Sequence, residues 1–319
     1  MGSARPFRID GIVPIIPTPF LANEEIDFAG LTDLLEFAVA GGACGVCLPA
    51  YASEFYKLCE REKEEVTTAA IRIVAGRIPV IGQANHPAAR EAARIARGLQ
   101  AAGADAVAVA VPRQFALAEG DLFRYYDRVL EAIQIPLVIQ DFNPGGASIS
   151  ARFIAELHNR HAHFRYVKLE EPMIAGKVRA ILEMTSGEVG VLDGWGGVYM
   201  LELVDAGACG VMPGLGVADL LSRVYSLARS GLKEEALKIF QGVLPQIIFS
   251  LQNLEFFHHA EKKLLKARGV LQHITVREVT VTVEPSDAAH VDFLNGGILA
   301  LLDTLGMPHN PAAATRVNG

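Results

Sequence analysis

Cysteine is scarce in this chain, which contains Cys44, Cys47, Cys59 and Cys209 among its 319 residues. Cys44 and Cys47 form a C-x-x-C pair, a spacing that also occurs in zinc and redox sites. No second such pair and no nearby pair of histidines completes a zinc ligand set. The pair lies within the apolar run 43–49. We therefore interpret these residues as small buried thiols and expect no metal site.

Basic patches and long apolar runs are also lacking. The net charge is −7, so we expect neither a nucleic acid nor a membrane surface as a partner. No apolar run reaches the roughly 18 residues that a membrane-spanning helix needs. Residues 1–10 lack the apolar core of a signal peptide, which predicts a cytoplasmic protein. No phosphate-binding loop or dinucleotide fingerprint occurs, and we expect no cofactor.

Apolar residues, in contrast, are abundant. They make up 51% of the chain, whereas charged residues make up 20%. This composition is typical of a globular protein with a large core and argues against disorder. The length exceeds that of most domains, but α/β barrels of about 250 residues form a single unit.

Short apolar runs alternate with longer amphipathic stretches along most of the chain. The apolar runs are 11–16, 44–48, 79–82, 106–111, 136–140, 165–169, 189–192 and 209–212. The amphipathic stretches are 31–39, 61–75, 87–102, 121–133, 150–158, 173–184, 197–205 and 217–229. The runs are continuous, as in parallel strands that are covered on both faces. Repeated strand–helix pairs of this kind predict an α/β fold, a (β/α)8 TIM barrel over residues 8–230.

The alternation stops after residue 229. Four helices are expected beyond it, at 232–242, 245–254, 257–268 and 287–305. Their amphipathic spacing predicts that residues 231–308 form a helical region packed on the barrel. We expect residues 309–319 to form a flexible tail.

Lys168 is the most informative candidate for chemistry. It lies within an apolar strand, between Val167 and Leu169, and lysine is rarely buried without a reason. Active sites of these barrels lie at the carboxyl ends of the strands. A desolvated lysine has a lowered pKa and is a nucleophile that condenses with keto groups. The alternative is a structural ion pair with Glu170 or another carboxylate.

Three other residues follow strands and are weaker candidates. Asp141 is either a general base or hydrogen-bond anchor, or a turn residue in a segment rich in turn formers. Glu54 is either a wall of the site or, as we favour from sequence alone, a charge at a helix amino terminus. Trp195 lies in a glycine-rich segment that could approach a ligand or pack a loop.

Three segments carry a family resemblance: Gly-Ile-Val-Pro-Ile-Ile-Pro-Thr-Pro-Phe at 11–20, Tyr-Val-Lys-Leu-Glu at 166–170 and Ala-Gly-Ala-Cys-Gly-Val-Met at 206–212. With them the chain resembles the dihydrodipicolinate synthase / N-acetylneuraminate lyase family of class I aldolases, over about residues 8–305. The resemblance implies that Lys168 is the Schiff-base lysine and that the substrate is a small 2-keto acid. It also implies a homo-oligomer, either a tetramer or a dimer.

The chain departs from the family pattern at three loops. The family's Gly-Thr-Thr-Gly-Glu loop holds the carboxylate of the keto acid, and here it reads Ala-Tyr-Ala-Ser-Glu at 50–54. By position, Tyr51, Ala52 and Ser53 would bind that carboxylate. Asp141 replaces the usual tyrosine after the fifth strand, and Arg-Gln-Phe at 113–115 replaces the tyrosine after the fourth. The synthase proton relay is therefore absent, and we do not expect dihydrodipicolinate synthase activity.

These divergent loops look more similar to the 2-keto-3-deoxy sugar acid dehydratases of the family. The shared pairs are Ser-Glu after the second strand, at 53–54, and Gln-Asp after the fifth, at 140–141. The resulting hypothesis is a Schiff base on Lys168 that acidifies C3 of the substrate, followed by loss of the C4 hydroxyl. Asp141 or Glu54 would be the acid or base, and Arg113 and Trp195 would line the distal pocket.

Two alternatives remain open from the sequence. The first is a retro-aldolase that cleaves the C3–C4 bond and yields pyruvate. The second is a sensor that binds a keto acid without turning it over, as the missing tyrosines suggest.

Overall fold

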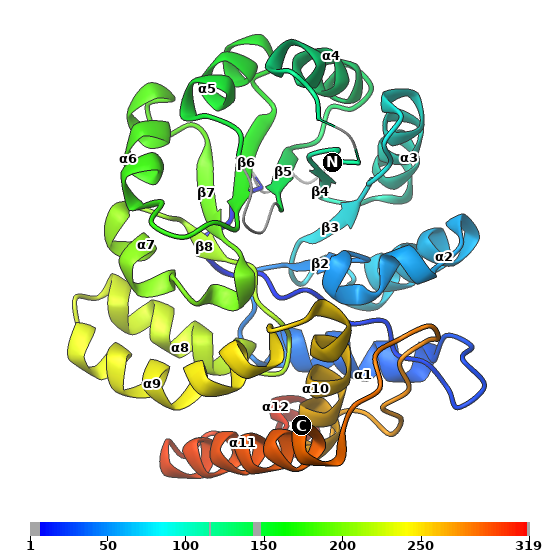
Figure 1. Cartoon of the computed structure of the whole chain (residues 1–319), viewed down its shortest axis with the longest axis vertical. Coiled ribbons are helices and arrows are strands. Elements are labelled where there is room, and N and C mark those ends of the chain that lie inside the picture. Colours follow the sequence, from blue (N-terminus) through cyan, green and yellow to red (C-terminus); the bar gives the residue numbers. More distant parts are fainter. Residues whose placement is uncertain (1–6, 115, 143–147, 318–319) are drawn as a thin grey trace.

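A computed structural model describes residues 7–114, 116–142 and 148–317. Eight parallel strands occupy the centre of the molecule (Figure 1). They are β1 (Gly11–Ile12), β2 (Val46–Leu48), β3 (Val80–Gln83), β4 (Ala106–Ala110), β5 (Leu137–Asp141), β6 (Phe164–Leu169), β7 (Gly190–Asp193) and β8 (Gly210–Val211). Neighbours in the sheet are neighbours in sequence, and β1 pairs with β8. The ring closes where Ile15 bridges to Cys47 and where the amide of Cys44 donates to Ile12 O at 2.8 Å.

A helix follows each strand and covers the outside of the ring (Figure 1). These helices are α1 (Phe28–Ala40), α2 (Glu60–Val74), α3 (Ala89–Ala102), α4 (Glu119–Leu130), α5 (Ala151–Arg160), α6 (Ala175–Met184), α7 (Met200–Ala206) and α8 (Ala218–Arg229). Short 3-10 helices precede two of them: η1 (Tyr51–Ser53) and η2 (Phe55–Lys57) before α2, and η3 (Trp195–Gly197) before α7. The predicted (β/α)8 barrel is confirmed.

Local sequence explains where several helices begin and end. The side chain of Asp27 accepts from the amide of Gly30 at 2.9 Å and caps α1, and Ser150 caps α5 in the same way through Phe153. Gly103 and Gly207 end α3 and α7 with φ of 95° and 104°. Both belong to Ala-Gly-Ala segments, and only glycine adopts this left-handed conformation without strain.

The strands separate two apolar layers. Val138, Tyr166 and Leu192 point into the barrel, where they form the inner cluster. Val167 and Leu169 point outward and pack beneath the helices. Because successive side chains of a strand alternate between its faces, the side chain of Lys168 shares the inner face with Tyr166.

The C-terminal region consists of α9 (Lys233–Ser250), α10 (Leu254–Ala267), α11 (Pro285–Thr304) and α12 (Pro311–Val317). It gathers on one side of the barrel, where α9 contacts α8 and α12 contacts α1 (Figure 1). Much of the tail prediction for 309–319 is wrong, because residues 311–317 form α12. The side chain of Asn310 accepts from the amide of Ala312 at 3.1 Å, and Ala312 is buried.

The predicted break between helices 232–242 and 245–254 is also wrong. One helix, α9, continues through Pro245. A proline inside a helix costs about 3 kcal/mol. Val243 and Ile247, on either side of Pro245, are buried in the core that includes α8, and this burial offsets the cost.

The four cysteines are free thiols, and Cys47 is fully buried in the inner cluster. Within the three described ranges, no group of His, Cys, Asp or Glu side chains is arranged to hold a metal ion. Among the helices of the same ranges, none is both long and apolar enough to cross a bilayer.

Candidate active site

Lys168 lies near the carboxyl end of β6 and points into the barrel, where it is 6% exposed. Glu170 follows two residues later, so strand alternation directs its side chain to the same face. The Nζ of Lys168 lies 2.8 Å from Oε1 of Glu170, and both side chains are buried. The ion pair that the sequence left as an alternative is therefore present. It joins an amine to a carboxylate that can exchange protons with it.

A chain of buried amides holds Glu170 from the other side. Gln140 is the register partner of Lys168 on β5, and its Nε2 donates to Oε2 of Glu170 at 3.1 Å. Gln83 on β3 donates in turn from Nε2 to Oε1 of Gln140 at 3.2 Å. From the sequence, Gln140 enters only as part of the Gln-Asp pair at 140–141 and Glu170 only as the partner of a structural ion pair, and Gln83 is not selected. Each of Gln83, Gln140 and Glu170 lies two residues after an inward-facing residue of its strand, and this spacing is the signal that identifies them. The inward-facing residues are Ile81, Val138 and Lys168.

Lys168, Glu170 and Gln140 line one pocket at the mouth of the barrel. Three aromatic rings form a wall of it: the ring centroid of Phe142 lies 5.1 Å from Tyr51 and 6.0 Å from Trp195. The remaining lining includes Ala52 of η1 and the apolar side chains Leu251, Leu254 and Phe257 of the C-terminal region. The structure thus brings the predicted residues Tyr51, Ala52 and Trp195 together with Lys168.

Tyr51 offers a hydroxyl group to this pocket. Burial, and then the negative charge of Glu170, raise the pKa of Tyr51 above its ordinary value. The hydroxyl is therefore protonated at neutral pH and can donate a hydrogen bond to an anionic group of a ligand.

Ser53 shapes the turn beside the pocket. Its hydroxyl donates to the carbonyl of Ile16 at 2.6 Å and accepts from the amide of Ala50 at 3.0 Å. The side chain is fully buried. The bond to Ile16 ties η1 to the segment after β1, and the bond from Ala50 closes the turn itself. The hydroxyl predicted to bind a carboxylate is therefore already used within the protein.

Asp141 lies on the other face of β5. It alternates with the inward-facing Gln140, and its carboxylate forms an ion pair with Arg113 and accepts from the amide of Ile149 at 2.7 Å. Burial raises the pKa of Asp141, and the guanidinium of Arg113 opposes that shift. The structure therefore does not bring this predicted base together with Lys168. Arg113 lines a neighbouring hollow, which shares Tyr51 with the Lys168 pocket.

Glu54 also faces away from the pocket. Its carboxylate is buried and accepts from Nζ of Lys262 at 2.6 Å, from Nζ of Lys57 at 3.3 Å and from the amide of Arg277 at 3.0 Å. These three bonds engage both oxygens of the carboxylate. Glu54 thus belongs to the contact between the η1–η2 segment and the C-terminal region.

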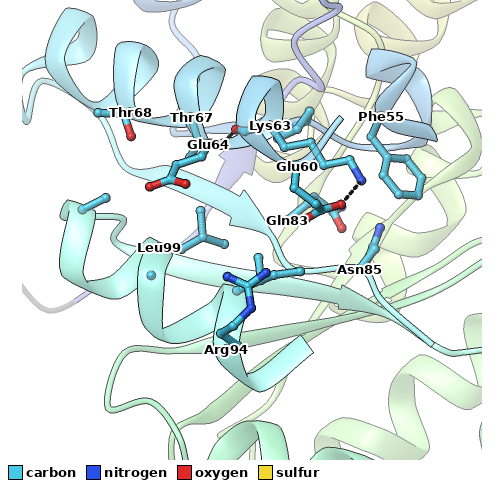
Figure 2. A pocket seen from close by; sticks show the side chains of 14 residues that line it. Phe55, Glu60, Lys63, Glu64, Thr67, Thr68, Gln83, Asn85, Arg94 and Leu99 are labelled. Carbon is cyan, nitrogen blue, oxygen red and sulfur yellow. Dashed lines mark hydrogen bonds and ion pairs between the residues drawn. The ribbon is translucent and has the colours of Figure 1, made fainter. Parts of the chain in front are cut away.

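A second hollow lies outside the ring of strands, between α2 and α3 (Figure 2). Lys63 donates to Glu60 at 2.7 Å across its upper edge, and Arg94 faces them from α3. Gln83 lines this hollow as well as bonding to Gln140. The lysine–carboxylate pair of this hollow, Lys63 and Glu60, lies on α2 and outside the barrel, so we assign the reacting site to the Lys168 pocket.

Fold and site together define a (β/α)8-barrel protein with a lysine–carboxylate pair at the mouth of the barrel. A model of the dihydrodipicolinate synthetase family matches residues 8–292, and the chain belongs to that family. The protein is accordingly a lyase.

Individual relatives agree with this assignment. The chain is 29% identical over 296 residues to L-2-keto-3-deoxyarabonate dehydratase of Azospirillum brasilense, covering 91% of this chain and 95% of the relative. It is 25% identical over 242 residues to 4-hydroxy-tetrahydrodipicolinate synthase of Methanopyrus kandleri, covering 75% and 80%. The crystal structure of dihydrodipicolinate synthase from Rhodopseudomonas palustris has a TM-score of 0.85 and 26% identity, covering 91% of this chain and 97% of that one.

Proposed function

We propose that this enzyme dehydrates a 2-keto-3-deoxy sugar acid through a Schiff base on Lys168. The observation that carries the proposal is the buried contact of 2.8 Å between Lys168 and Glu170 in the mouth of the barrel. The similarity to a 2-keto-3-deoxyarabonate dehydratase supports this substrate class.

Schiff-base formation uses both members of the pair. Glu170 takes a proton from the ammonium of Lys168, and the free amine attacks C2 of the keto acid. Glu170 returns that proton to the C2 oxygen and then carries a second proton from the nitrogen to the same oxygen, which leaves as water. The product is a protonated imine between Nζ and C2, and Glu170 is again a carboxylate.

Elimination follows from the positive charge of the imine, which acidifies the C3 protons. Glu170 removes a C3 proton, and the electron pair forms an enamine. The enamine expels the C4 hydroxyl, which takes the proton from Glu170 and leaves as water. A second water hydrolyses the imine, releasing the unsaturated keto acid and Lys168. Glu170 thus takes the acid–base role that was expected from the sequence for Asp141 or Glu54.

The remaining pocket residues orient the substrate. Tyr51 and Ala52 lie beside Lys168, and we assign them to the carboxylate of the keto acid, next to the reacting C2. Trp195 and Phe142 form the wall along which the hydroxylated end of the substrate extends.

Product analysis tests this proposal. The enzyme would be supplied with a 2-keto-3-deoxypentonate, and the products would be identified by NMR and mass spectrometry. We expect a keto acid that has lost one water. Lys168→Ala should abolish the reaction. Lys177→Met, in a lysine of α6 that pairs with Glu171 at 2.6 Å, should retain it.

Other outcomes would contradict dehydration in different ways. If the products were pyruvate and an aldehyde, the reaction would be retro-aldol cleavage and not dehydration. Tight binding of the keto acid with no product would favour a sensor.

A further inference from the structure

Glu54 is buried although it does not face the reaction pocket. It links η1 to η2 with a φ of 58°, a left-handed conformation that is uncommon for a residue with a side chain. Its side chain is 1% exposed, and three donors surround the carboxylate. Such a conformation persists when the surrounding structure holds the residue in place.

Lys262 supplies the shortest of these contacts. It projects from α10 and is fully buried, and its Nζ donates to Glu54 at 2.6 Å and to the carbonyl of Thr275 at 2.8 Å. The same ammonium lies 4.5 Å from the ring centroid of Phe20. Burial lowers the pKa of Lys262 to about 8, although Glu54 opposes the shift. Buried ion pairs add little net stability, because desolvation offsets the attraction, and some instead specify one conformation.

The turn attached to Glu54 is the one that reaches the pocket. The amide of Glu54 donates to the carbonyl of Tyr51 at 3.1 Å, and that of Ser53 donates to Ala50 at 2.9 Å. Tyr51 and Ala52, between these bonds, line the pocket of Lys168. A displacement of Glu54 would therefore move Tyr51 and Ala52 relative to Lys168.

Other charges reinforce the same contact. Lys57 also pairs with Glu255 of α10 at 2.6 Å, and the guanidinium of Arg277 pairs with Glu62 of α2 at 2.9 Å. Each pair joins the segment after β2 to the C-terminal region. Glu54 and Lys262 are the most deeply buried of these partners.

We propose that Glu54 and Lys262 are positioning residues, through which the C-terminal region fixes the Tyr51–Ser53 turn in the conformation that binds the substrate carboxylate. The inference rests on the proposed function, because it assigns the carboxylate to this turn. It predicts that loss of the pair weakens keto-acid binding while the chemistry on Lys168 persists.

The test uses the double variant Glu54→Gln/Lys262→Met in the full chain. Removing both charges leaves neither one buried without its main partner, so this variant should fold where a single substitution could fail. Lys263→Met is the matched control, because Lys263 is the next residue of α10 and pairs with Asp292 at 2.8 Å while partly exposed. Circular dichroism would establish that each variant is folded.

Two measurements would be made on each variant. The first is the pyruvate concentration that gives half-maximal borohydride trapping on Lys168. We expect a rise of about tenfold in the double variant, equivalent to about 1.4 kcal/mol of binding, with the same yield at saturation. The second is amide hydrogen exchange, which should become faster at residues 53–58. Lys263→Met should match the wild type in both.

Unchanged half-saturation in the folded double variant would overturn the proposal, whatever the exchange result. Unchanged exchange would overturn it as well, because the turn would then not depend on the pair. No trapping in the wild-type protein at any pyruvate concentration would contradict the proposed function instead. Hydrogen exchange would in that case still decide whether the pair fixes the turn.

Discussion

The proposed chemistry depends on one contact between two residues, Lys168 and Glu170. Lys168 could be selected from the sequence, because a lysine between valine and leucine in a strand is exceptional. Glu170 was harder to select, because it follows the last residue of β6. Its carboxylate reaches Lys168 only if the side chains continue to alternate between the two faces beyond the end of the strand. Its distance of 2.8 Å from the lysine amine shows that the alternation continues.

Substitution of Glu170 separates Schiff-base formation from elimination. In Glu170→Gln, the adduct of pyruvate on Lys168 should form more slowly, because the group that moves the protons is lost. It should still be trapped after long incubation, because the amine and the pocket remain. Dehydration should slow by at least about 100-fold, since the group that takes the C3 proton is lost. Rates of turnover and trapping yields would be measured on the same preparation.

Glu171→Gln is the control for this experiment. Glu171 is adjacent, partly exposed and paired with Lys177 rather than with Lys168. The dehydration rate of Glu171→Gln should match that of the wild type. Wild-type turnover in Glu170→Gln would remove Glu170 from the mechanism.

Asp141 and Glu54 show why residue type and order along the chain cannot identify a base. Asp141 is the last residue of β5 and Glu54 follows β2, and the carboxyl ends of these strands meet at the mouth of the barrel. Asp141 nevertheless belongs to the outer face of β5, where Arg113 binds it. Glu54 forms an ion pair with Lys262, which lies 208 residues away in the sequence. No local pattern reports a partner so distant.

At the scale of elements, apolar runs predicted the order and kind of the barrel elements. The incorrect helix predictions concern segments whose structure depends on packing against residues far away in the sequence. A new helix was expected to begin at Pro245, yet α9 continues through it because the residues on both sides are buried. The segment 309–319 was expected to be a flexible tail, yet α12 packs on α1. The short helices η1 and η2 carry no apolar period at all.

Glu261 connects α10 to the loop before α8 and makes folding pH-dependent. Its carboxyl is buried and accepts from the amide of Gly216 at 2.6 Å. Burial raises its pKa from the ordinary 4.5 to about 7, and the bond from Gly216 opposes the shift. Between these pH values the folded protein holds a proton that the unfolded chain releases. The stabilisation is therefore complete below pH 4.5 and is lost as pH rises through 7.

Glu261→Gln should remove this pH dependence. In the wild type, we expect the free energy of unfolding to change by about 3 kcal/mol between the two pKa values of Glu261. Urea unfolding at a series of pH values would measure it. Glu234→Gln, at an exposed position of α9, should keep the wild-type slope. An unchanged slope in Glu261→Gln would show that Glu261 does not hold the proton.

At the scale of the whole molecule, the barrel and the C-terminal helices share one core. A single apolar cluster contains Ile12 and Leu31 of the barrel together with Leu264 of α10 and Ile298 of α11. The buried pair of Arg268 and Asp219, at 2.6 Å, also joins α10 to α8. We therefore propose that residues 8–230 and 231–308 fold as one unit.

Calorimetry should show one cooperative unfolding transition. Shared burial couples the two regions, so neither can lose its core while the other keeps it. Two resolved transitions would mean that the C-terminal region is an independent domain. We also propose that the protein is a homo-oligomer, a dimer or a tetramer, and light scattering would give its mass in solution.

Borohydride trapping would show whether Lys168 forms a Schiff base with a keto acid. The wild-type protein and Lys168→Ala would be incubated with pyruvate, reduced, digested and analysed by mass spectrometry. We expect an adduct on Lys168 in the wild type and none in the folded variant. An absence of adduct on every lysine of the wild-type protein, or an equal adduct in Lys168→Ala, would contradict the Schiff-base mechanism.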